Sequence, residues 1–107
     1  MHTENWKTAV AEAIEDWSIW EVRMADADGP TRHVVGWCRD LHRGARVSSR
    51  VVAFDAPTRR VLTRSGRVYV LDGPPGFVPD TQYTWDTWLG NNQATVLREL
   101  TRELVPE

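Results

Sequence analysis

A β-hairpin is predicted by the segment Arg59-Arg-Val-Leu-Thr-Arg-Ser-Gly-Arg-Val-Tyr-Val-Leu71. Its two strand-like runs, 59–64 and 67–71, are separated by Ser65-Gly66, which is the spacing of a two-residue hairpin loop. Such a loop would place Arg64 opposite Arg67, Leu62 opposite Tyr69 and Arg60 opposite Leu71, all on one face. The other face, with Val61, Val68 and Val70, is then the side that packs against the core.

The residues before this hairpin predict three more strands. Alternating apolar and polar side chains indicate strands over Trp20–Met24, Arg32–Cys38 and Arg46–Phe54. The connections between them are short and rich in Asp, Gly and Pro, which favour turns. We therefore expect a meander that forms a curled antiparallel sheet of about five strands.

A helix is expected at the N-terminus. Its apolar residues recur at helical spacing over Glu4–Asp16, with Trp6, Val10, Ile14 and Trp17 on one stripe. We expect this helix to pack on one face of the sheet.

Two helices are expected near the C-terminus, after a Pro- and Gly-rich loop over residues 72–79. The first is short, carries Trp85 and Trp88 on one face and ends at Gly90, and the second spans Asn92–Leu104. Residues 1–107 are thus predicted to form a single α+β domain, with the sheet flanked by the N-terminal helix and the C-terminal helices. A small SH3-like barrel with the helices as appendages is the alternative architecture.

Composition narrows the class of protein. Hydrophobic residues make up 41% and charged residues 26% of the 107 residues, which are values typical of one folded domain. A single cysteine excludes an internal disulfide, and no apolar run is long enough to span a membrane. We therefore expect a cytoplasmic protein, monomeric or homodimeric, that does not interact with membranes.

No residue pattern indicates catalysis. His33, Cys38 and His42 have the spacing H-x4-C-x3-H, which matches no common zinc module, so we expect neither a metal nor another cofactor. The serines lack a nucleophile-elbow motif, and no glycine-rich phosphate loop is present. The sequence predicts a protein that is not an enzyme.

Charge is distributed unevenly along the chain. Residues 32–67 carry nine arginines against two acidic residues, a net charge of +7 in a chain whose total is −2. The candidate partner-binding residues extend from this basic middle segment onto the adjoining strand and lie on the face of the sheet that is predicted to be exposed to solvent: Arg46, Arg50, Arg60, Leu62, Arg64, Arg67 and Tyr69. Arginines that face one another across a ladder require nearby anions. Three sources are open: the protein's own acidic helices, nucleic-acid phosphates with Tyr69 as a stacking residue, or an acidic protein surface.

Residues 32–89 resemble small proteins of phages, prophages and mobile elements in GC-rich proteobacteria. The resemblance rests on the segment Val47–Asp55, on the segment Thr58–Gly76, and on the later motif Tyr83-Thr-Trp85-x-x-Trp88. It implies a small inhibitor or accessory protein, comparable to anti-CRISPR and other anti-defence inhibitors, that docks on a larger protein or nucleoprotein complex. Direct binding of nucleic acid through the Arg-rich face is the alternative function.

Overall fold

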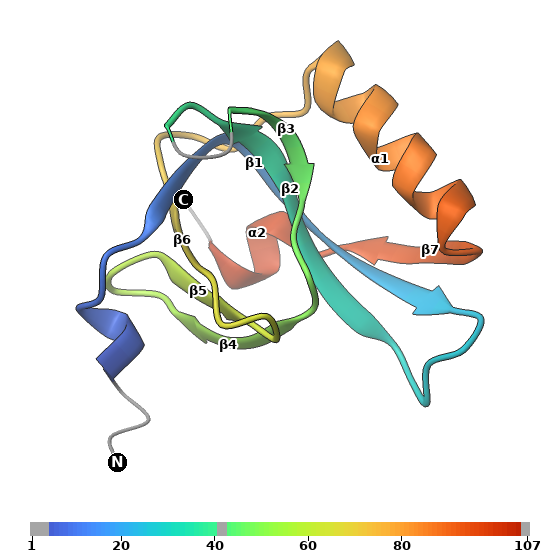
Figure 1. The fold of residues 1–107 in the computed structure, drawn as a ribbon, viewed down its shortest axis with the longest axis horizontal. Helices are drawn as coiled ribbons and strands as arrows, with labels where there is room; N and C mark the ends of the chain where they lie inside the picture. The colour runs from blue at the N-terminus through green and yellow to red at the C-terminus, as the bar shows by residue number, and fades with distance from the viewer. Residues whose placement is uncertain (1–4, 41–42, 106–107) are drawn as a thin grey trace.

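The computed structural model describes residues 5–40 and 43–105, which form an α+β domain with a seven-stranded mixed sheet (Figure 1). The strands are β1 (Glu12–Met24), β2 (Thr31–Cys38), β3 (Gly44–Val47), β4 (Val51–Asp55), β5 (Arg60–Thr63), β6 (Val68–Leu71) and β7 (Ala94–Glu99). The helical elements are the 3-10 turn η1 (Asn5–Lys7), the helix α1 (Pro79–Asn91) and the short helix α2 (Thr101–Leu104). Within these described residues no helix is long and apolar enough to cross a membrane.

The long strand β1 organises the sheet. The strand order is β3-β2-β1-β6-β5-β4, and β7 also pairs with β1. On the edge away from β2, residues 12–14 of β1 pair in parallel with β6, whereas residues 20–24 pair antiparallel with β7. A β-bulge between these two parts, where Asp16 has a φ of 48°, redirects the strand from one neighbour to the other. The sheet is therefore mixed rather than purely antiparallel, and it is open, because β3 and β4 end the path without pairing with each other in the described chain.

Two hydrophobic clusters lie on opposite sides of β1. The larger cluster contains Trp17, whose side chain is fully buried and whose indole Nε1 donates a hydrogen bond of 3.1 Å to the carbonyl of Gly73. Around Trp17 lie Ile14, Ile19, Val34, Cys38, Val61, Tyr69, Leu71 and Leu100. The second cluster joins Val22 and Val35 to Trp85 of α1.

Helix α1 confirms the predicted helix with Trp85 and Trp88 on one face. Pro79 at its first position has the fixed φ that a helix start favours. The rings of Trp85 and Trp88 are stacked with centroids 5.4 Å apart, and Trp20 of β1 lies 5.7 Å from Trp85. This row of aromatic rings holds α1 against β1 and β2.

The predicted N-terminal helix over Glu4–Asp16 is wrong, because in its described part, residues 5–16, only the turn η1 is helical and the residues from Glu12 onward belong to β1. Val10, expected on the buried stripe, is 95% exposed. A helix of this length is marginal in water without tertiary packing. In the sheet, residues 12–14 pair with β6, and Ile14 and Glu15 pair with β2.

The predicted helix over Asn92–Leu104 is also wrong for most of its length. Ala94–Glu99 forms β7 on the edge of β1, and only Thr101–Leu104 is helical. The predicted strand Arg46–Phe54 is divided into β3 and β4 by residues 48–50. These differences raise the number of strands from the expected five to seven.

The β5–β6 hairpin exists, but its pairing differs by one residue from the prediction. Leu62 pairs with Val68, Val61 with Tyr69, and Arg60 with Val70. The loop has three residues, 64–66. A hydrogen bond from the Thr63 amide to the Arg67 carbonyl closes it, and Gly66 adopts a φ of 91°. A three-residue loop with glycine in the left-handed region is a common hairpin connection. A shift of one residue changes which side chains of β6 share a face with Val61. Val61 is in the core as predicted, but Tyr69 and Leu71, expected on the exposed face, are each only 2% exposed.

Candidate functional site

The seven predicted partner-binding residues separate into three groups. Arg46, Arg67 and Tyr69 form an internal network, in which Arg46 Nε donates a hydrogen bond of 3.1 Å to Tyr69 Oη. A hydrogen bond with Tyr69 is also the main cause that raises the pKa of Arg67. Tyr69 therefore lies in the core and not on a solvent-exposed face, so its predicted position is wrong.

This internal network extends to the buried carboxyl group of Glu12 and the thiol of Cys38. Cys38 is fully buried, and burial followed by the nearby charge of Glu12 raises the pKa of its thiol to about 12. A thiol with this pKa stays protonated and is a poor nucleophile at neutral pH. The arginines of the network thus balance charge inside the fold.

Arg60 and Leu62 form the second group, on the outward side of β5. The Arg60 guanidinium donates to the carbonyl of Ala9 through Nη1, and the same atom lies 3.5 Å from the carbonyl of Trp6. Leu62 is half-buried. Arg60 therefore fastens the N-terminal segment to the sheet.

Arg50 and Arg64 form the third group, and both are exposed. Arg50 lies in the connection between β3 and β4, and Arg64 lies in the hairpin loop between β5 and β6. A backbone hydrogen bond of 2.9 Å from the Arg64 amide to the Arg50 carbonyl holds the two segments together. Neither side chain has an ion pair or hydrogen bond within residues 5–40 and 43–105.

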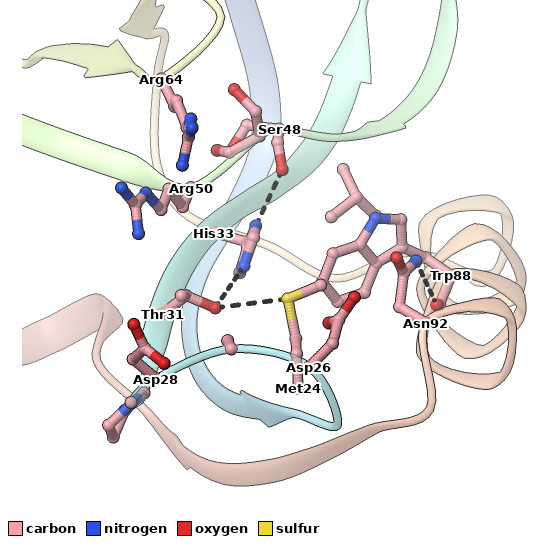
Figure 2. A pocket seen from close by; sticks show the side chains of 15 residues that line it. Met24, Asp26, Asp28, Thr31, His33, Ser48, Arg50, Arg64, Trp88 and Asn92 are labelled. Carbon is pink, nitrogen blue, oxygen red and sulfur yellow. Dashed lines mark hydrogen bonds between the residues drawn. The ribbon is translucent and has the colours of Figure 1, made fainter.

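These two arginines border a pocket of about 550 Å³, which we call the His33 pocket (Figure 2). Its floor contains His33 and Thr31 of β2, and one wall is formed by Trp88 and by Asn92 just after α1. The side facing the arginines is the connection between β1 and β2, which contributes Asp26 and Asp28. In Figure 2 the arginines lie above His33 and the aspartates lie below it.

His33 is held in one neutral form. Its Nδ1 lies 2.9 Å from the carbonyl of Ser48, which can only accept, so Nδ1 carries the proton. Its Nε2 then accepts from the Thr31 hydroxyl at 2.8 Å. Burial lowers the pKa of His33, and the ring packs against Trp88 with centroids 4.6 Å apart. Because both ring nitrogens are engaged, this histidine stabilises the pocket floor and has no free nitrogen for a ligand.

The sequence did not reveal Asp26, Asp28, His33 or Trp88 as pocket residues. In the sequence, Asp26 and Asp28 indicate only a turn between two strands. The one feature that could have marked them as site residues is the Asp-Ala-Asp pattern in that connection. His33 was considered as a metal ligand together with Cys38 and His42. His33 packs against α1, whereas Cys38 lies in the other cluster, and His42 is outside the described residues. In the part of the chain that the structure describes, no group of three or more His, Cys, Asp or Glu side chains is placed to hold a metal ion.

Comparison of the chain with protein families, with curated proteins and with solved structures gives no match.

Proposed function

We propose that this protein is a small non-enzymatic binding protein that docks on a larger protein through the exposed pair Arg50 and Arg64. The observation that carries this proposal is that the Arg64 amide donates a hydrogen bond to the Arg50 carbonyl, while neither guanidinium group has a partner among residues 5–40 and 43–105. Two neighbouring cations repel each other, and a carboxylate placed between them removes that repulsion. Arginine also forms bidentate hydrogen bonds with carboxylates and is enriched at protein interfaces.

Internal neutralisation of this pair receives no support from the positions of the acidic residues. Glu12 is buried in the network with Tyr69 and Arg67, and Glu103 lies 3.4 Å from Arg98. Glu15 pairs with Arg39 at 2.8 Å. Within the described residues no carboxylate lies within ion-pair distance of Arg50 or Arg64.

Nucleic-acid binding remains the alternative. Fewer of the seven candidate residues are available to contact nucleic acid than the sequence predicted. Tyr69 is buried and cannot stack on a base, while Arg46 and Arg60 make internal hydrogen bonds. Arg50 and Arg64 are left to contact phosphates. This alternative predicts a gel shift with DNA or RNA at ~50 mM salt that weakens steeply as salt is added.

The resemblance to phage and mobile-element proteins suggests that the docking has an inhibitory role. An inhibitor of this kind acts by covering a surface of a larger complex, as anti-CRISPR proteins do. The arginine pair favours a partner surface that carries exposed carboxylates. We propose that the partner is such a complex of the host.

The test compares two variants that change the charge by the same amount. Arg64→Glu reverses one member of the pair, and Arg23→Glu reverses an exposed arginine of β1 that does not line the pocket. We expect proteins captured from a host lysate by the wild type and by Arg23→Glu to be lost with Arg64→Glu. Both variants should melt within the range of ordinary surface substitutions. Equal capture by all three proteins would contradict the proposal, and so would a gel shift that Arg64→Glu abolishes.

A further inference from the structure

The His33 pocket carries opposite charges on its two facing sides. Arg50 and Arg64 border one side, and Asp26 and Asp28 border the other. All four side chains are exposed, and within residues 5–40 and 43–105 no ion pair of 4.0 Å or less joins the two sides. Among the described residues the two sides therefore do not neutralise each other. A ligand with a charge at each end would satisfy both sides at once.

The surface between the two charged sides suits an uncharged chain. It includes the thioether of Met24, the indole of Trp88 and the neutral ring of His33. The Thr31 hydroxyl is directed to His33 and lies 3.6 Å from the sulfur of Met24, so it is occupied within the floor. Methylene groups in this position would contact apolar and aromatic atoms without leaving a buried polar group unsatisfied.

We propose that the His33 pocket binds a small zwitterion in which a carboxylate and an ammonium group are separated by a short aliphatic chain. The carboxylate lies beside Arg50 and Arg64, and the ammonium group lies on the side of the pocket that Asp26 and Asp28 border. The aliphatic chain crosses Met24 and Trp88. The volume of about 550 Å³ is within the range of small-molecule sites.

Other ligand classes fit this arrangement less well. A polyphosphate would meet the arginines but would also face Asp26 and Asp28, whose carboxylates repel it. A metal ion would find no more than the two aspartate carboxylates as ligands, because both nitrogens of His33 already form hydrogen bonds. No group of three or more potential ligands occurs among the described residues. A hydrocarbon would leave both charged sides without a partner.

The experiment titrates isotope-labelled protein with defined probes and follows the amide signals of pocket residues such as Gly29 and Ser49 by NMR. The probes are ω-amino carboxylates of increasing length, from β-alanine to 6-aminohexanoate, with hexanoate and hexylamine as singly charged controls. For a ligand of this size we expect a Kd on the order of 10 mM for the longer zwitterions. Removing either charge from the probe should weaken binding about two- to five-fold, the range of exposed ion pairs.

Protein variants assign each end of the ligand. Arg64→Gln should weaken the binding of 6-aminohexanoate but not that of hexylamine, and Asp28→Asn should weaken the binding of 6-aminohexanoate but not that of hexanoate. Arg23→Gln, outside the pocket, should leave the affinity for 6-aminohexanoate unchanged. The proposal is overturned if hexanoate binds as tightly as the zwitterion, if chain length has no effect, or if no probe shifts the pocket signals.

This titration contains no partner protein, so its outcome does not depend on the docking function. A negative result removes the zwitterion site and leaves the capture experiment unaffected. Loss of the docking proposal likewise leaves the titration valid.

Discussion

The substitution Gly36→Ala tests how closely β1 and β2 approach at the β-bulge. A Cβ atom at Gly36 would lie 2.7 Å from Ile14 Cγ1 and 2.9 Å from the carbonyl oxygen of Glu15. Ile14 is fully buried and the second contact is with backbone, so neither atom has an easy way to move. Overpacking of this kind costs about 1 to 3 kcal/mol. The loss of a flexible glycine from the unfolded chain offsets about 0.4 to 1 kcal/mol.

We therefore expect Gly36→Ala to lower the free energy of unfolding by roughly 1 to 2 kcal/mol. For a domain of this size each kcal/mol corresponds to roughly 4–8 °C in Tm. Urea unfolding followed by tryptophan fluorescence measures the effect directly. The matched control is Gly29→Ala, because nothing lies within 4 Å of its Cβ position and its φ is outside the left-handed region. If both variants were as stable as the wild type, the close approach of β1 and β2 at Gly36 would be wrong.

Three further predictions concern buried side chains. Trp17→Ala should cost about 3 to 5 kcal/mol, as large aromatic truncations in cores do, and an unchanged Tm would refute the burial of Trp17. Because burial lowers the pKa of His33 below its ordinary 6.5, the unfolded chain takes up this proton first as the pH falls. The free energy of unfolding should thus be unaffected by His33 above about pH 6.5 and should decrease below it, by at most about 1.4 kcal/mol per pH unit. Urea titrations of His33→Gln should lack this contribution, and identical pH profiles would contradict it. The thiol of Cys38, with its pKa raised to about 12, should react with a thiol reagent at neutral pH only after unfolding; fast labelling of the native protein would count against its burial.

Local signals predicted those parts of the fold that local contacts determine. The helix α1, the strand β2 and the existence of the β5–β6 hairpin follow from periodicity and turn residues. The nature of β1 does not, because its buried residues Ile14 and Trp17 are three apart, as on a helix. That spacing arises because the bulge at Asp16 inserts an extra residue into a strand. The parallel pairing of β1 with β6 joins segments more than fifty residues apart, and no local pattern indicates it.

The candidate site was partly predictable for a similar reason. Arg50 and Arg64 were selected because they belong to a basic segment, and the structure leaves both exposed beside a pocket. The opposite side of that pocket comes from Asp26 and Asp28, and a wall comes from Trp88. These residues are brought together only by the pairing of β1 with β2 and by the packing of α1. Composition and spacing contain no information about that convergence.

The length of one loop explains why the predicted arginine face does not exist as a single surface. A two-residue loop would have placed Arg64 directly opposite Arg67 in the ladder, where like charges destabilise pairing. The three-residue loop instead puts Arg64 in the turn, next to Arg50, and moves Tyr69 to the interior, where it accepts a hydrogen bond from Arg46. The same shift therefore forms the internal network of Arg46, Arg67 and Tyr69 and leaves the two arginines that border the pocket. Any change that restored a two-residue loop would reverse both outcomes, because alternate side chains in a strand face opposite sides.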